Sequence, residues 1–293
     1  MQEFFMKAKK MKLNVIGYDA EELVERFIES KREPTKTHLS EIKNNISQAD
    51  LHYKDCGDRN LLKTMHPITL TTLQKNSLKK CYKNKTTLID LIINEIRSEQ
   101  DVFHDRYCPF CGFYKPIEID HYLPITEFPE FSFIPINLIP ICPKCNKAKS
   151  NYWIKDDERI FLNKYFDDDN LDEFLICKPK IIDENSIIFE YCLDSVKLAD
   201  IQKGDIIKTH YEKLNIMTIY NDNSNSIISE LDDSLCAFKG NLHDLKETIE
   251  KHYKNCREKY GLNFYKTVTY KTIFETDDVL QWYYDRIPND NKY

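Results

Sequence analysis

The sequence predicts an α+β fold, with mostly helical flanks around a small core held together by four cysteines. Three observations indicate this class. Apolar residues recur at helical spacing in the first hundred residues, two Cys-x2-Cys pairs follow, and a two-strand pattern then precedes further helices. We therefore expect a helical N-terminal region (1–100), a cysteine-rich core (101–155), and a β-hairpin followed by a helical C-terminal region (156–293).

Composition limits the classes of protein that fit. The chain has 293 residues, 41% of them hydrophobic, which suits one or two globular domains. Its net charge is −6, so any contact with nucleic acid needs a local basic patch. No long apolar segment marks a secretion signal or a membrane span, and we expect a cytoplasmic protein without a membrane partner. The absence of GxxxxGK and GxGxxG disfavours the common phosphate-binding loops.

Two helices are expected in the N-terminal region, over residues 19–30 and 86–101. In the first, Asp19 is a good N-cap, and Leu23 and Phe27 recur at helical spacing. In the second, the apolar residues that share one face are Leu88, Leu91, Ile92 and Ile96. The second helix runs directly toward the first cysteine pair.

The paired cysteines predict a structural zinc site. Cys108 and Cys111 form one Cys-x2-Cys pair, and Cys142 and Cys145 form a second pair after thirty intervening residues. In a chain without an export signal, paired cysteines favour a metal over disulfides. Thiolates are preferred ligands of tetrahedral Zn²⁺, and each pair supplies two of them. We expect a loop-rich, zinc-stapled unit whose folding depends on the metal.

The segment between and just after the pairs carries polar residues suited to chemistry. Alternating apolar residues predict a short, half-buried strand that ends in Asp120 and His121. Asn137 begins a second apolar strand that leads into the second cysteine pair. A helix is expected after that pair, and on it Asn146 and Lys149 share a face. Zinc would then hold this helix against the first strand.

Two further features of the core bear on its surface and interior. From residue 144 to 155 there are four lysines and no acid, a local basic patch that suits a phosphate group. Phe128, Phe131 and Phe133 are expected to pack around a small core rather than to stack on a base.

The order strand, loop, strand, helix resembles the HNH, or ββα-metal, endonuclease family over residues 108–153. The resemblance rests on "DHYLP", on the asparagine of "NLIPICPKC" and on "CNKAK". Asn146 stands where many members have histidine, so the chain resembles an HNN variant. An amide oxygen there suits a hard ion such as Mg²⁺, which prefers oxygen ligands.

The resemblance implies the roles of the central residues. His121 would be the general base that activates water for attack on a phosphodiester. Asp120 and Asn146 would hold a catalytic Mg²⁺ or Mn²⁺, separate from the structural zinc. Asn137 would orient the loop or the histidine ring. Two lysines would contact the backbone phosphate: Lys147 and Lys149.

The substrate and the partners stay open at this level. Contacts to phosphate do not distinguish DNA from RNA, so an HNH ribonuclease is an alternative to the favoured DNA endonuclease. A zinc-dependent module that binds nucleic acid or protein without catalysis is a second alternative. Stand-alone HNH proteins with such cores resemble components of bacterial antiphage systems, which implies an ATPase or another separate targeting subunit.

The remaining sequence gives expectations for the C-terminal region. The acidic stretch 156–173 is expected to be a solvated face, and residues 174–193 to form two strands around a turn. Residues 224–260 are the longest helix candidate, whereas 264–274 fits either a strand or a helix start.

Overall fold

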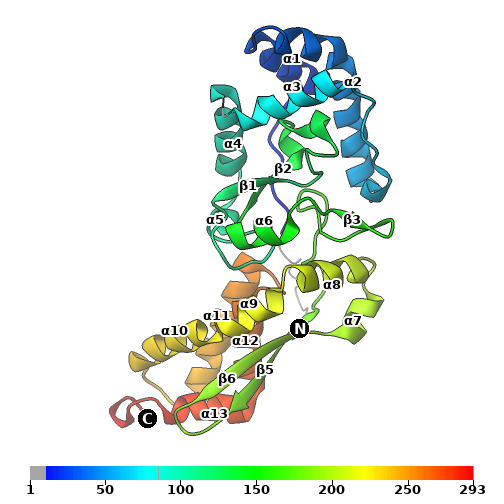
Figure 1. Cartoon of the computed structure of the whole chain (residues 1–293). Helices are drawn as coiled ribbons and strands as arrows, with labels where there is room; N and C mark the ends of the chain where they lie inside the picture. Colours follow the sequence, from blue (N-terminus) through cyan, green and yellow to red (C-terminus); the bar gives the residue numbers. More distant parts are fainter. Residues whose placement is uncertain (1–10, 85, 293) are drawn as a thin grey trace, which may run out of the picture. The chain divides into compact units, whose positions relative to one another are not determined.

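The computed structural model describes residues 11–84 and 86–292. Residues 1–10, 85 and 293 of the predicted flanks lie outside the described residues. The chain forms two compact units, one spanning Lys12–Asp167 and the other comprising Met11 and the chain from Asp168. The α+β class is confirmed, because helices dominate and each sheet in the described part is a two-stranded antiparallel pair (Figure 1). The predicted boundaries at residues 100 and 155 both fall inside the first unit.

The first unit consists of a helical segment, a strand pair with a long connecting loop, and a short helix (Figure 1). Its elements in chain order are α1 (Ala20–Glu29), α2 (Thr35–Asp58), η1 (Leu62–Thr64), α3 (Thr72–Lys83), α4 (Thr87–Ser98), α5 (Val102–Arg106), β1 (Glu118–His121), η2 (Pro129–Phe131), η3 (Pro135–Asn137), β2 (Leu138–Ile141), α6 (Pro143–Lys149), β3 (Ile154–Lys155) and β4 (Glu158–Arg159).

The two helices expected in the N-terminal region are confirmed as α1 and α4. Asp19 caps α1, where its side chain accepts a hydrogen bond from the backbone N–H of Glu22 at 2.8 Å. Leu23 and Phe27 point into the core, as their spacing predicted. In α4, Ile92 and Ile96 are buried as expected, but the third buried residue is Ile89, because the predicted face was displaced: Leu91 is exposed and Leu88 is half-buried.

The predicted order strand, loop, strand, helix is confirmed in the centre of this unit. β1 and β2 pair antiparallel, with Asp120 opposite Ile139 and His121 opposite Leu138. All four residues of β2 are buried, so β2 is the strand of the pair that lies deeper in the core. The loop of residues 122–137 joins the strands, and α6 follows β2 directly.

Aromatic packing fixes this loop against the helices. The ring of Phe133 stacks on Phe27 of α1 with centroids 4.0 Å apart, and the ring of Phe131 lies 5.0 Å from that of Tyr53 in α2. Phe128 packs edge-on against Trp153. All three loop phenylalanines are fully buried, so the expectation of core packing is confirmed.

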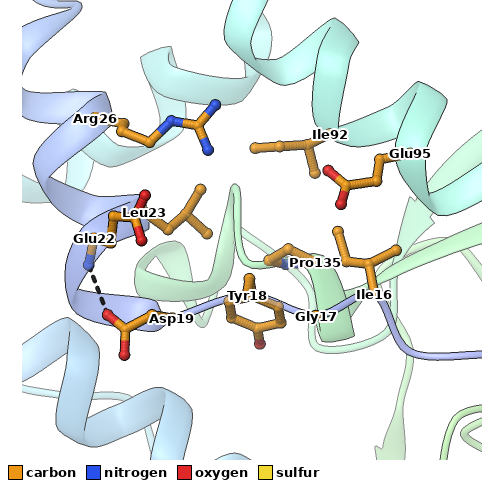
Figure 2. Close-up of a pocket in the computed structure, with 10 residues that line it drawn as sticks. All are labelled: Ile16, Gly17, Tyr18, Asp19, Glu22, Leu23, Arg26, Ile92, Glu95 and Pro135. Carbon is orange, nitrogen blue, oxygen red and sulfur yellow. Dashed lines mark hydrogen bonds between the residues drawn. The ribbon is translucent and has the colours of Figure 1, made fainter.

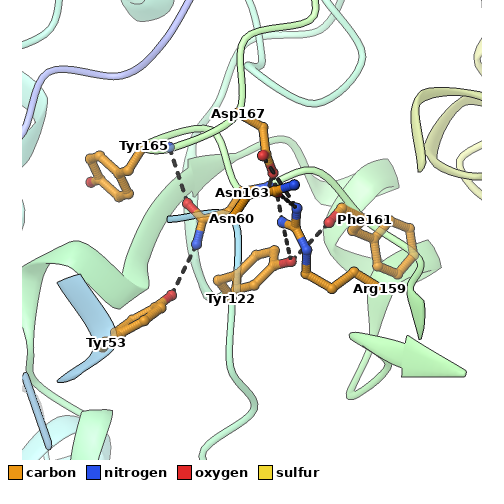
Figure 3. A network of polar contacts seen from close by, with 8 residues as sticks. All are labelled: Tyr53, Asn60, Tyr122, Arg159, Phe161, Asn163, Tyr165 and Asp167. Carbon is orange, nitrogen blue, oxygen red and sulfur yellow. Dashed lines mark hydrogen bonds and ion pairs between the residues drawn. The ribbon is translucent and has the colours of Figure 1, made fainter. Parts of the chain in front are cut away.

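A buried polar network secures the end of the first unit (Figure 3). Arg159 makes two contacts to the carboxylate of Asp167, at 2.7 and 3.3 Å, and donates to the side-chain oxygen of Asn60 at 3.0 Å. The hydroxyl of Tyr122 donates to the carbonyl of Phe161 at 2.9 Å. A paired and hydrogen-bonded guanidinium of this kind is how a protein keeps a buried charge.

The expectation of a solvated face over residues 156–173 is wrong for its central part. Ile160, Phe161, Leu162 and Tyr165 are buried, and Arg159 and Asp167 neutralise one another inside the fold. The charged residues of this stretch therefore alternate with residues that belong to the core.

Glu130 is a buried carboxyl group in the loop between β1 and β2. Its Oε1 atom accepts a hydrogen bond from the backbone N–H of Ile68 at 2.8 Å, whereas Oε2 has no partner among the described residues. Burial raises the pKa of Glu130 from its ordinary value of 4.5 to about 7. The folded protein thus favours the protonated acid.

Glu130→Gln is expected to stabilise the protein more at pH 8 than at pH 5.5. Because the folded pKa is raised, the carboxyl contributes fully to stability below its unfolded pKa, and this contribution is lost as pH rises through about 7. The gain from the substitution should grow by about 1–2 kcal/mol between the two pH values. Urea unfolding at both pH values measures it, and an equal effect at both would contradict the buried acid.

The second unit combines a β-hairpin with helices (Figure 1). Its elements are β5 (Leu175–Ile181), β6 (Ile187–Leu193), α7 (Ser195–Asp200), α8 (Gly204–Lys213), α9 (Ile216–Asp222), α10 (Ser224–Cys236), α11 (Leu242–Tyr260), α12 (Tyr265–Glu275), α13 (Asp277–Asp285) and η4 (Asn289–Asn291). The expected strand pair is confirmed, with Ile181 opposite Ile187 beside the turn.

The prediction of one continuous helix over residues 224–260 is wrong. The chain leaves the helix after Cys236 and begins α11 at Leu242. Gly240 has a φ of 154°, and Asn241 caps α11 in a reciprocal capping box with Asp244. Residues 264–274, whose sequence fits either a strand or a helix start, are helical and lie within α12 apart from the first residue.

Candidate functional site

Four buried cysteines form a cluster that is positioned to bind a metal ion. The sulfur atoms of Cys108, Cys111, Cys142 and Cys145 all lie within 4.8 Å of one another. The sulfurs of Cys111 and Cys142 are 3.9 Å apart. Zn–S bonds of about 2.3 Å in a tetrahedron require sulfurs about 3.8 Å apart, so the cluster fits a structural zinc ion.

Local backbone chemistry shapes both halves of this cluster. Gly112 follows the first pair with a φ of 63°, and its N–H donates to the carbonyl of Cys108 at 2.7 Å. In the second half, Cys142 is the N-cap of α6, and its sulfur accepts a hydrogen bond from the N–H of Cys145 at 3.4 Å. Pro143 occupies the first helical position, where no N–H is needed.

α6 docks along β1 through the polar contacts of two of its side chains. The side-chain amide of Asn146 donates to Oε2 of Glu118 at 2.7 Å. One turn later, Nζ of Lys149 lies 2.8 Å from Oδ2 of Asp120 and also donates to the backbone carbonyl of His121 at 2.8 Å. The structure thus brings Lys149 together with Asp120 and His121, whereas Asn146 contacts Glu118 on the same strand. The cysteine cluster at the start of α6 holds this arrangement in place.

The imidazole of His121 is held in one orientation. Its Nε2 lies 2.9 Å from the backbone carbonyl of Ser132, which only accepts hydrogen bonds, so Nε2 carries the proton. Nδ1 then bears the lone pair, and it has no partner in the described part of the chain. Tyr82 of α3 contacts the ring edge-on, with centroids 4.4 Å apart. Burial lowers the pKa of His121 to about 4, so the ring is neutral at neutral pH.

Asn137 organises the loop between the strands. Its Oδ1 atom accepts from the N–H of Leu123 at 2.8 Å and from the hydroxyl of Tyr53 at 3.2 Å. Its amide nitrogen donates to the carbonyls of Leu123 and Phe131 at 3.0 and 3.3 Å. Of the two roles predicted for Asn137, this geometry serves the orientation of the loop.

Asp120 and Lys149 form a largely buried ion pair. Burial raises the pKa of Asp120 and lowers the pKa of Lys149, and the charge of each group opposes the shift of the other. Lys149 is 0% exposed, which differs from the solvent-facing position that its predicted phosphate contact needs. Lys147, the other lysine predicted to bind phosphate, is exposed on α6.

Three neighbours of the site were not predicted from the sequence. Glu118 shares the Asp120 face of β1 and bonds Asn146. Arg97 of α4 donates to the carbonyls of Pro116 and Glu118 and so fixes the start of β1. Tyr82 contacts His121 from a helix far earlier in the chain. The spacing of Glu118 and Asp120 on one strand could have indicated the first, whereas the other two depend on tertiary packing.

A pocket of about 310 Å³ lies elsewhere in the first unit, between the start of α1, α4 and the loop (Figure 2). Its lining includes the acidic side chains of Asp19, Glu22 and Glu95 and the single cation Arg26. It contains none of the predicted site residues, and its excess of carboxylates disfavours a phosphate ligand.

Comparison with known proteins finds a partial similarity to a phage protein. Protein ea31 of Escherichia phage lambda is 35% identical to this chain over 111 residues, and the match covers 36% of this chain. The chain matches only 38% of the length of the phage protein. Neither a family model nor a solved structure matches the chain. Within the described part, the helices are all too short or too polar to cross a membrane.

Proposed function

We propose that the chain is a metal-dependent HNH-type endonuclease that hydrolyses phosphodiester bonds of nucleic acid, with DNA favoured. The environment of His121 carries this proposal. A backbone carbonyl holds Nε2, Nδ1 is unpaired, and the oxygen ligands of Asp120 and Asn146 belong to the same junction of strand and helix. This combination supports proton abstraction beside a face that suits a divalent cation.

His121 would act as the general base through Nδ1. The neutral ring has a lone pair there to accept a proton from an attacking water. The carbonyl of Ser132 would stabilise the positive charge that develops on the ring, since it accepts the Nε2 proton at 2.9 Å. Tyr82 would limit rotation of the ring through its edge contact.

Asp120 and Asn146 would hold Mg²⁺ or Mn²⁺, with Glu118 beside Asn146 as a further oxygen donor. These donors fit such ions, which prefer oxygen ligands. Lys149 lies 2.8 Å from Oδ2 of Asp120, and a carboxylate has about four acceptor sites on its two oxygens, so Asp120 would retain ligand capacity. When bound, the ion would stabilise the negative charge that develops on the phosphate in the transition state.

Asn137, Lys149 and Lys147 would have supporting roles. Asn137 would fix the loop that carries Ser132, and thereby the ring of His121. Lys149 would orient Asp120 from inside the fold, whereas the exposed Lys147 would contact the substrate phosphate. Through the family resemblance we also propose that a separate ATPase directs the nuclease in an antiphage system. Copurification of such a subunit from the native host tests that part.

Asn146→Ala is expected to weaken the response to Mg²⁺ by about 10–100-fold while the protein stays folded, because one oxygen ligand is lost. Asn146→His should retain activity, since imidazole is also a metal ligand. The measurement is the rate of nicking of supercoiled plasmid against Mg²⁺ concentration, with zinc-loaded protein freed of other metals. Asn151→Ala, an exposed asparagine just beyond α6, is the matched control.

If Asn146→Ala cleaves like the parent protein at limiting Mg²⁺, Asn146 serves only to bond Glu118, and its assignment as a ligand fails. If the parent protein nicks no nucleic acid in Mg²⁺ or Mn²⁺, the proposed activity fails, and the zinc-dependent binding module is the better account.

A further inference from the structure

α3 is a helix rich in lysine and free of acidic residues. Lys75, Lys79, Lys80 and Lys83 lie on it, and its sequence contains neither Asp nor Glu. None of the four ammonium groups has an ion-pair or hydrogen-bond partner in the described part of the chain. Three are exposed, and Lys79 is half-buried. In a chain of net charge −6, this helix is a local concentration of unneutralised positive charge.

Three of these lysines form a row along the helix. Lys75, Lys79 and Lys83 are spaced at i, i+4 and i+8, so their side chains lie one above another on one side of α3. At a rise of 1.5 Å per residue the row spans about 12 Å. One strand of duplex DNA carries a phosphate about every 3.4 Å along the axis, so the row matches about three to four phosphates.

α3 is also the helix that touches the candidate base. Tyr82, which precedes Lys83, contacts the ring of His121 edge-on and donates its hydroxyl to the carbonyl of Ile119 at 3.4 Å. One turn earlier, the carbonyl of Leu78 accepts a hydrogen bond from the hydroxyl of Ser132 at 2.8 Å. The lysine row is therefore attached rigidly to the residue that would carry out the chemistry.

The usual account of a surface lysine row is a solvated helix face that binds nothing. Such faces normally alternate lysine with glutamate at i, i+4, as α11 does with Glu247 and Lys251 or Glu250 and Lys254. α3 has no such compensating acids on its own turns. Glu130 lies near Lys75, but it is buried and its pKa is raised to about 7.

We propose that the row of Lys75, Lys79 and Lys83 binds the phosphate backbone of duplex DNA and aligns it on His121. This inference rests on the proposed function and extends it, because it names a substrate-binding surface outside the strand–helix junction. The buried position of Lys149 leaves α6 with fewer exposed lysines than its sequence suggests, and α3 supplies the missing charge.

The test compares two triple variants with the same change in net charge. The first carries Lys75→Gln, Lys79→Gln and Lys83→Gln. The control carries Lys178→Gln, Lys208→Gln and Lys213→Gln, three exposed lysines of the second unit without ion-pair partners among the described residues. Both are made in the His121→Ala background, so binding of a fluorescent 20-base-pair DNA duplex is measured without cleavage, across a series of salt concentrations.

The α3 variant should bind at least about tenfold more weakly at 0.15 M salt, and the slope of log K against log salt should fall by about 2–3, because each lost phosphate contact removes about 0.9 from that slope. The control variant should stay within about twofold of its background. With active protein, the α3 variant should raise KM while kcat stays nearly constant, since the catalytic residues are unchanged.

Equal affinity and an equal salt slope for the two variants would overturn the inference. Surface substitutions of this kind rarely unfold a protein, and thermal unfolding of each variant checks this. If the triple variant does not fold, each single substitution should still lower the salt slope by about 1. Because binding is measured without cleavage, the two claims can fail separately. A parent protein that binds DNA through α3 but never cuts it would refute the proposed function and leave this inference standing.

Discussion

His121→Ala is expected to lower the rate of plasmid nicking by about 10²–10⁴-fold, the usual cost of losing a general base. The substitution removes the Nδ1 atom, whose lone pair would accept a proton from the attacking water. KM should change little, because His121 is buried and its side chain contacts Ser132 and Tyr82 rather than solvent-facing groups. Zinc content should be unchanged, since His121 is not part of the cysteine cluster.

The matched control for this variant is His66→Ala, an exposed histidine of the same unit. It should cut like the parent protein. A His121→Ala variant that binds one zinc per chain, unfolds like the parent and keeps near-parental activity at neutral pH would show that His121 is not the base.

Loss of the zinc ion should have the largest effect on stability. Cys142→Ser removes one of the four sulfurs, whereas the serine hydroxyl can still cap α6. Binding of a structural zinc contributes apparent free energies of about 10–16 kcal/mol in small zinc domains, which exceeds the stability of an ordinary domain. We therefore expect residues 108–153 to unfold, to release α6 from β1, and to lose cleavage completely.

Elemental analysis and circular dichroism of the purified variant measure this effect. Cys256→Ser is the control, since Cys256 lies in the second unit and outside the cluster. It should retain one zinc per chain. Parent protein without zinc, or a Cys142→Ser variant as stable as the parent, would remove the structural zinc from this account.

The parts of the fold that depend on local chemistry could be predicted from the sequence. The two cysteine pairs specify a metal cluster because ligand type and spacing suffice for it. The strand ending at His121 follows from short-range alternation, and the helix that carries Asn146 was also expected, although it begins at Pro143 rather than after Cys145. The break at Gly240 was missed because apolar spacing on either side looks continuous, although the glycine and the Asn241 cap signal it.

The parts of the fold and of the site that depend on tertiary packing could not be predicted from the sequence. Helical spacing correctly places Asn146 and Lys149 on one face, but only docking onto β1 decides that Lys149 is buried against Asp120. The contact of Tyr82 with His121 joins residues far apart in the chain, and no local pattern encodes it. Likewise, the acidic residues around Ile160 indicate an exposed segment, although the segment belongs to the core. Only the fold brings Arg159 and Asp167 together as a buried ion pair.

The most direct test of the central claim is the conversion of supercoiled plasmid to nicked circles by the purified, zinc-loaded full chain. We expect nicking in Mg²⁺ or Mn²⁺, none in EDTA at a concentration that leaves the zinc bound, and none above background with His121→Ala in the same buffer. Nicking that is independent of added metal, or that is equal in the parent protein and His121→Ala, would contradict a metal-dependent nuclease with His121 as its base.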